Sequence, residues 1–254
     1  MFLLFVQEDS MSLPATPILR EDGEVLGLVR LTMQACEVAR ASVSHAIDGL
    51  VHGTAAALQS VRKCEEMLDD FDRELDQRLA PTITHVTPPQ AQELLACMKL
   101  MLDLERIGDL VASFAERAAI VRERIDMEDI GHLTKMACLL ENMLEQVARA
   151  FIEQNVDQAL KVYRADSELD RLRNLLLMRH TDNANGLRQE SLHVLFMATA
   201  LERAGDHSKN IAEEICHLAT GHTVRHLRRT KDKCFEQLFL DWLAKEIPTQ
   251  AKIM

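Results

Sequence analysis

The chain of 254 residues carries a formal net charge of −11, and 47% of its residues are apolar but only 4% aromatic. This acidic balance excludes a general nucleic-acid surface, because neutralising phosphates requires a basic patch or stripe. The residues are largely good helix formers such as Leu, Ala, Met, Glu, Arg and Gln, with little Gly or Pro. We therefore expect an all-α protein. Its net negative charge is compatible with binding cations or a basic partner.

Apolar periodicity predicts six long helices separated by breaks rich in Gly, Pro, Asn and Asp. In chain order they cover about residues 24–52, 54–79, 89–122, 131–153, 156–179 and 187–219. A short C-terminal helix is expected after the sequence TKDK. The segment before the first helix and the tail beyond residue 247 are expected to be irregular.

The sequence shows no membrane span and no targeting segment. The N-terminal MFLLFV lacks a basic leader and is too short to cross a bilayer, and no later window reaches about 18 uncharged apolar residues. The six cysteines never form a CxxC pair, which is typical of unpaired core thiols in a reducing compartment. These features predict a cytoplasmic protein.

An acidic motif occurs twice, as LERIGD from Leu104 and as LERAGD from Leu201. Each copy follows a second acidic segment on the preceding helix, CEEMLDDFDREL in the first half and ADSELDRLRNLL in the second. Aligning these segments pairs Leu68 with Leu169. The chain therefore reads as two tandem three-helix bundles related by a pseudo-twofold repeat. The predicted divisions are 1–23 (irregular), 24–125 (first repeat), 126–222 (second repeat) and 223–254 (C-terminal extension).

The acids of each motif share one face of their helix, since each residue turns by about 100°. Like charges four residues apart destabilise a helix by roughly 0.2–0.5 kcal/mol per pair. A mid-helix glycine, here Gly108 and Gly205, costs about 1 kcal/mol more than Ala. A divalent cation would remove the repulsion, and glycine would let a neighbouring helix or a ligand approach closely. The candidate metal-binding residues are Glu65, Asp69, Glu105, Asp109, Glu116, Asp166, Asp170, Glu202, Asp206, Asn210 and Glu213.

Other interpretations of these residues stay open. The acids could form solvated faces paired with Arg106 and Arg203, and the duplication could preserve only packing. Two ExxH pairs, at Glu190 and Glu214, have the spacing of di-iron ligands, but both fall on the same predicted helix and cannot share one centre. The basic run RHLRRTKDK over 225–233 is expected to be a solvated connector or a contact for a partner or anionic lipid.

The segments LERIGDLVASFAERA and LERAGDHSKNIAEEI resemble the two signature motifs of the PhoU family of phosphate-signalling proteins. ADSELD and the VRHL at 224–227 extend the resemblance, which covers about residues 24–228. It implies two three-helix bundles whose acidic motifs bind multinuclear metal clusters, with iron or zinc expected before magnesium or manganese. It also implies a negative regulator, not an enzyme, that couples the ATPase of the phosphate ABC transporter to its sensor histidine kinase.

We further expect a homodimer that binds no nucleic acid and reaches the membrane only through its partners. An accessory module of a sodium–phosphate cotransporter is the alternative, followed by a metal-dependent hydrolase. The first half departs from the family pattern at PPQAQELL and at Ser113. The second half is therefore the stronger candidate for an occupied metal site.

Overall fold

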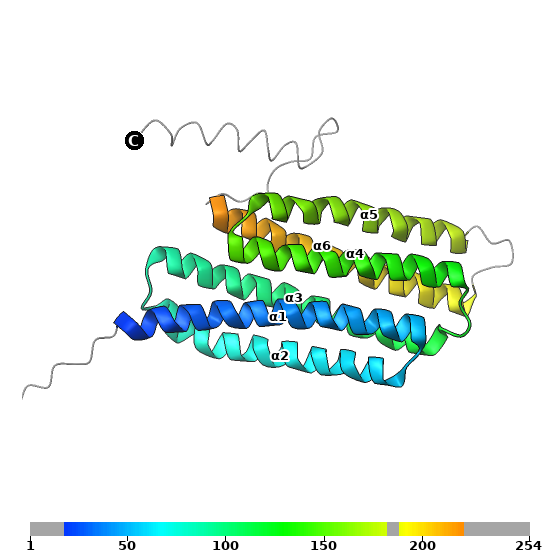
Figure 1. Ribbon diagram of the computed structural model, residues 1–254, viewed down its shortest axis with the longest axis horizontal. Helices are drawn as coiled ribbons and strands as arrows, with labels where there is room; N and C mark the ends of the chain where they lie inside the picture. Colours follow the sequence, from blue (N-terminus) through cyan, green and yellow to red (C-terminus); the bar gives the residue numbers. More distant parts are fainter. Residues whose placement is uncertain (1–17, 182–187, 221–254) are drawn as a thin grey trace, which may run out of the picture.

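The computed structural model describes residues 18–181 and 188–220 and contains six helices and no strand within them (Figure 1). The all-α prediction is confirmed. The predicted C-terminal helix and the basic run at 225–233 lie outside the described residues. The helices are α1 (Ile18–His52), α2 (Ala55–Ile83), α3 (Pro88–Val121), α4 (Met127–Glu153), α5 (Val156–Thr181) and α6 (Gln189–Thr220).

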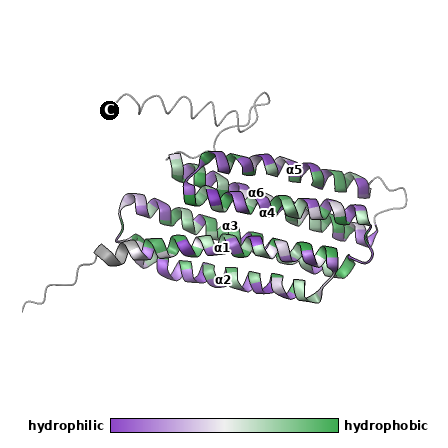
Figure 2. Cartoon of the chain, viewed as in Figure 1, coloured by the Kyte–Doolittle hydropathy of each residue, from purple (hydrophilic) through white to green (hydrophobic). Residues whose placement is uncertain are grey.

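Two three-helix bundles lie side by side with their helices running along the long axis of the molecule (Figure 1). Helices α1, α2 and α3 pack on one another, as do α4, α5 and α6, which gives each half the same order. The halves meet where α3 packs on α6 and α1 packs on α4. Buried apolar side chains from both halves form one continuous cluster, while polar residues cover the outer faces of the helices (Figure 2).

Helices α1 and α2 extend beyond the limits that the sequence predicted. Helix α1 begins at Ile18, so the last part of the segment 1–23, expected to be irregular, is helical. Helix α2 continues past Pro81, where a break was expected, and ends at Ile83. A proline costs a helix one backbone hydrogen bond and crowds the preceding turn, and its position in the last turn of α2 limits this disruption. There the hydroxyl of Thr82 donates to the carbonyl of Arg78 at 2.7 Å.

Local polar contacts fix the starts of α3 and α4. Before α3, the side-chain oxygen of Gln90 accepts hydrogen bonds from the backbone N–H and the hydroxyl of Thr87, at 3.0 and 2.8 Å. Helix α4 begins earlier than predicted because the carboxylate of Asp126 accepts the backbone N–H of Asp129 at 2.8 Å, which satisfies a free donor of its first turn. None of the described helices is long and apolar enough to cross a membrane.

Candidate functional site

The predicted acids of the first half lie on two neighbouring helices, α2 and α3. Glu65 and Asp69 come from α2, and Glu105, Asp109 and Glu116 come from α3. Partial burial raises the pKa of Glu65, and the charges of Asp109, Asp69 and Glu116 raise it further. Although Arg62 opposes the shift, the structure brings acids of both helices close enough to repel one another, as the repeat predicted.

Glu105 shows the same effect. Partial burial raises its pKa, and so do the charges of Asp109, Asp69 and Asp72, while neighbouring Arg106 opposes the shift. Asp72, which was not among the predicted residues, belongs to the same group, because partial burial and the charges of Asp76 and Asp69 raise its pKa. Its position one turn beyond Asp69 on α2 was readable from the sequence as a continuation of the acidic face. We refer to these acids of α2 and α3 as the first acidic face, which consists of Glu65, Asp69, Asp72, Glu105, Asp109 and Glu116.

The second acidic face consists of Asp166 and Asp170 on α5 with Glu202 and Asp206 on α6. Partial burial raises the pKa of Glu202, and the charge of Asp206 adds to this. Arg173 opposes the shift, whereas the charges of Asp170 and Asp166 also raise the pKa. Burial raises the pKa of the Tyr163 phenol, and Glu213, further along α6, raises it further.

The glycine of each motif is explained by the packing between these helices. A Cβ atom at Gly108 would lie 2.6 Å from Cδ1 of Leu68, and one at Gly205 would lie 2.5 Å from Cδ1 of Leu169. Both leucines are fully buried. Of the two roles predicted for glycine, the structure shows the close approach of a neighbouring helix. Glycine therefore sets the spacing between the two helices that carry each acidic face.

Basic side chains contact the two faces differently. Arg62 pairs with Glu116 at 3.0 Å, and Arg106 lies 3.3 Å from half-buried Glu105 and 3.5 Å from Asp109, and both arginines are exposed. In the second face, by contrast, a largely buried ammonium group, Lys209 Nζ, lies 2.6 Å from Asp166 Oδ2. Lys209 lies inside the second motif but was not among the predicted residues.

Asn210, predicted as an extension of the second acidic face, makes a contact in another direction. Its amide donates to Asp103 of α3 at 3.4 Å, and His207 also lies 2.7 Å from that carboxylate. Nearby, Lys99 donates to Glu214 at 2.7 Å. These pairs join α3 to α6 across the contact between the two halves. The helical rotation of Asn210 relative to Asp206 turns its side chain toward α3, which the repeat alone did not reveal.

Carboxylates are oxygen donors of the kind that hard cations accept. Among the described residues, however, no three Asp, Glu, His or Cys side chains converge closely enough to hold a metal ion. The first acidic face fits a cation in chemistry and charge, since its inner acids repel one another and, among the described residues, no basic side chain forms a hydrogen bond or ion pair with Glu65 or Asp69. Its side chains would have to rotate toward a shared ion. The second face already contains a cation in Lys209.

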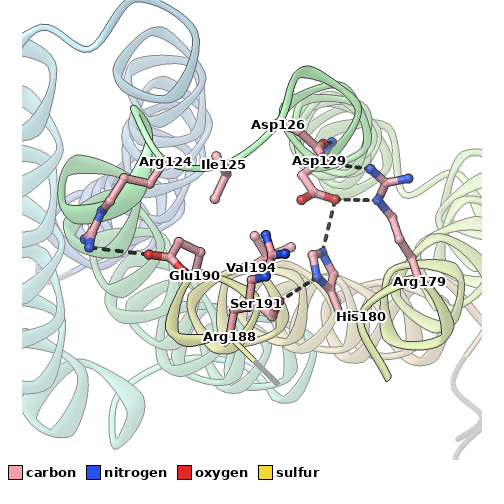
Figure 3. Close-up of a pocket in the computed structure, with 10 residues that line it drawn as sticks. All are labelled: Arg124, Ile125, Asp126, Asp129, Arg179, His180, Arg188, Glu190, Ser191 and Val194. Carbon is pink, nitrogen blue, oxygen red and sulfur yellow. Dashed lines mark hydrogen bonds and ion pairs between the residues drawn. The ribbon is translucent and has the colours of Figure 1, made fainter. Parts of the chain in front are cut away.

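A separate pocket of about 400 Å³ lies at the end of the second half, between the starts of α4 and α6 and the end of α5 (Figure 3). Arg179 contacts Asp126 and Glu128 at 2.6 Å and Asp129 at 3.0 Å. Beside it, buried His180 lies 3.1 Å from Asp129 and 3.0 Å from Ser191 (Figure 3).

Sequence analysis assigned no role to these residues. The sequence does show an acidic DMED segment at 126–129 and an Arg-His pair at 179–180. It could not show that they meet, because their contact depends on how α4, α5 and α6 pack. Asp129 is already held by Arg179, and Ser191 and His180 are both buried. The network links the ends of three helices through hydrogen bonds and ion pairs.

Comparison with known proteins shows where this architecture recurs. The sequence profile described as "PhoU domain" matches residues 32–118 and 133–215, one match in each half. The Thermotoga maritima protein named phosphate-specific transport system accessory protein PhoU homolog 1 is 27% identical over 195 residues, covering 74% of this chain and 84% of that protein. A Rhizobium meliloti PhoU homolog is 29% identical over 211 residues, covering 79% of this chain and 87% of that protein.

Solved structures share the fold. The crystal structure of PhoU from Pseudomonas aeruginosa superposes with a TM-score of 0.73 at 22% identity, covering 79% of this chain and 99% of that one. The regulatory protein PhoU from Streptococcus pneumoniae superposes equally well, with a TM-score of 0.73 at 19% identity, covering 80% of this chain and 98% of that one. At these identities, the likeness to the solved structures establishes the arrangement of helices.

Proposed function

The chain belongs to the PhoU family, and from that premise we propose that it regulates phosphate uptake as an accessory protein of a phosphate-specific transport system. The single observation that carries this proposal is the double acidic motif. Each copy lies inside one of the two matched regions, and the fold places each copy beside a second acidic segment from the neighbouring helix. Relatives of this chain bear the names of phosphate-specific transport system accessory proteins.

The proposed regulation acts through protein contacts. The chain would bind the ATPase of the phosphate ABC transporter, its sensor histidine kinase, or both, and restrain uptake when phosphate is abundant. It would act in the cytoplasm as a homodimer and reach the membrane only through these partners. Its role is regulatory rather than enzymatic.

Cations are the second part of the proposal. Iron or zinc, before magnesium or manganese, would bind carboxylates of the first acidic face and relieve the repulsion that raises the pKa of Glu65 and Glu105. Asp69 and Asp109 supply further oxygen donors from the facing helices. A bound metal would reduce the negative charge of this surface, which changes the partners that it accepts.

The experiment that tests the regulatory role is deletion of the gene in its own host. Expression of phosphate-starvation genes in excess phosphate is expected to rise strongly on deletion and to return to the repressed level when the wild-type chain is restored. Unchanged expression in the deletion strain would contradict the proposal. Purification of the tagged chain from the host should recover the transporter ATPase or the kinase.

An accessory module of another transporter, such as a sodium–phosphate cotransporter, is the second candidate. It is favoured by the departures of the first half from the family pattern at residues 88–95 and at Ser113, and by the N-terminal residues that the family profile leaves unmatched. Recovery of such a cotransporter without any phosphate ABC component would support this candidate. The two candidates therefore differ in which membrane protein accompanies the purified chain.

A further inference from the structure

The two acidic faces are related by the repeat, but only one contains a buried cation of its own. Lys209 Nζ lies 2.6 Å from Asp166 Oδ2 and 3.9 Å from Asp206 Oδ1, and so lies between the two helices that form the second face. The side chain of Lys209 is 16% exposed and that of Asp166 only 7%. A solvated surface lysine would not be held so closely or buried so far.

We propose that Lys209 is the resident cation of the second acidic face, in the place that a metal would otherwise take, and that the chain consequently binds metal at the first face alone. The inference rests on the metal-binding part of the proposed function and makes it more specific. It assigns different roles to two motifs that look nearly equivalent in sequence. Lys209 would compensate the charge of Asp166 and hold α5 against α6 whether or not metal is available.

The repeat shows what the first face has at the same position. Alignment of Glu105 with Glu202 places Ala112 at the counterpart of Lys209. Ala112 is buried and carries no charge. Glu65, the counterpart of Asp166, therefore has no ammonium group from α3 beside it. The arginines that contact the first face, Arg62 and Arg106, are themselves more than half exposed, so neither is a buried counter-ion like Lys209.

Contacts on its other side hold Lys209 in place. Its Nζ lies 5.8 Å from the centre of the Tyr163 ring, and Tyr163 is itself buried on α5. An ammonium over an aromatic face is attracted by the electrons of the ring. With Asp166 one turn further along the same helix, α5 supplies both a carboxylate and an aromatic ring to this lysine. The ammonium group is therefore part of the packing between α5 and α6.

Geometry and charge oppose a metal at the same place. Metal–oxygen bonds with carboxylates are about 2.0–2.6 Å long. An ion bound to Asp166 would share that carboxylate with an ammonium nitrogen 2.6 Å away, and the two cations would repel each other in a poorly solvated position. Lys209 would have to leave its partner and its ring before a metal could bind. At the first face, no largely buried lysine would have to be displaced before a metal could bind.

This inference reverses an expectation from the sequence. The second motif matches the family pattern better, and the sequence therefore favoured it as the occupied site. In the structure, Lys209 determines which face is free to bind metal. It lies within the well-matched second motif, but the prediction compared only the acids of the two motifs. The first half, although a weaker match, retains acids of two facing helices without a buried counter-ion.

The test measures metal bound to the purified full-length chain by plasma mass spectrometry, after loading with Zn²⁺ alone or with Mn²⁺ alone and removal of free ions. Two variants disable one face each with neutral groups of similar shape: Glu65→Gln with Asp109→Asn, and Glu202→Gln with Asp206→Asn. The first pair is expected to remove nearly all bound metal. The second pair is expected to leave it unchanged.

Lys209→Met then removes the ammonium while keeping an unbranched apolar side chain. Bound metal should roughly double, and adding Glu202→Gln with Asp206→Asn should abolish the gain. Lys135→Met is the matched control, because Lys135 pairs with Glu168 at an exposed position, and it should change nothing. Circular dichroism and thermal unfolding verify that each variant is folded.

Ala112→Lys gives a reciprocal measurement that does not depend on the folding of Lys209→Met. A lysine there is expected to displace metal from the first face. Metal that is lost with the second-face pair and retained with the first-face pair would overturn the inference while leaving metal binding intact. If neither the wild type nor Lys209→Met binds metal, the metal-binding part of the proposed function is refuted together with this inference. Phosphate regulation would still be tested separately by the gene deletion.

Discussion

Leu169 packs directly against the backbone of Gly205, so closely that a Cβ atom at the glycine would lie 2.5 Å from the leucine Cδ1. Leu68 and Gly108 make the same contact in the first half, at 2.6 Å. The repeat therefore preserves a specific approach of two helices. The acids on those helices come close together because the glycine permits it.

This packing predicts that Gly205→Ala destabilises the protein. Alanine would gain about 1 kcal/mol of helix propensity, but the methyl group would overlap buried Leu169, and overpacking of this kind costs about 1–3 kcal/mol. We expect a net loss of about 1 kcal/mol in the free energy of unfolding, measured in urea. Gly131→Ala on α4 is the control, because nothing lies within 4 Å of its Cβ position, and it should stabilise by about 0.5–1 kcal/mol. A stabilised Gly205→Ala variant would contradict the contact.

The raised pKa of Glu65 predicts a dependence of stability on pH in metal-free protein. Since the pKa is higher in the folded state, that state binds more protons than the unfolded state in the window above the ordinary Glu value of about 4.3. Stability contributed by this group is therefore lost as pH rises through the folded-state pKa. Glu65→Gln should be more stable than wild type at pH 7, with a smaller difference at pH 4.5, in urea titrations with chelator.

Glu66→Gln, an exposed change on the same helix, serves as the control for that measurement. It should show little dependence of its stability difference on pH. If Glu65→Gln and Glu66→Gln behaved alike, the mutual repulsion assigned to the first acidic face would be wrong. Addition of Zn²⁺ should reverse the order at pH 7, because the wild type would then gain stability from the bound ion.

Arg179→Met is expected to destabilise the second half by about 2–4 kcal/mol, because it leaves buried Asp129 without its guanidinium partner. Two further ion pairs, with Asp126 and Glu128, are lost in the same change. Arg171→Met, which breaks an exposed pair with Glu168, should cause no measurable change. Thermal unfolding of the two variants checks this, and equal melting temperatures would show that the pocket network contributes nothing.

Thiol labelling should distinguish exposed from buried cysteines. Cys138 is exposed and is expected to react with iodoacetamide in the native protein. Burial raises the pKa of Cys36 and Cys216 to about 12 and that of Cys97 to about 11, which suppresses the reactive thiolate. Peptide mapping by mass spectrometry should find these three unmodified until urea unfolds the chain. Native labelling of Cys97 at the rate of Cys138 would contradict the packing of the core.

The sequence by itself determined the helices, the order of the two halves and most of the acids of each acidic face. Periodicity at 3.6 residues is a local property, so it showed that Glu105 and Asp109 share one face of a helix. The repeat added a second constraint, and it correctly paired Leu68 with Leu169 before their roles were known. Helix ends were predicted less well, since capping by Asp126 and continuation past Pro81 depend on individual hydrogen bonds and on nearby packing.

Only the tertiary structure decided which partners these faces meet. Asn210 contacts Asp103 because α6 packs on α3, and Arg179 meets Asp129 because α5 ends beside the start of α4. Lys209 turns inward to Asp166 rather than outward to solvent. Each contact joins residues far apart in the chain, and a long side chain on a helix reaches more than one neighbour. The physical outcome depends on helix spacing, here set by glycine, and on the charges that burial brings together.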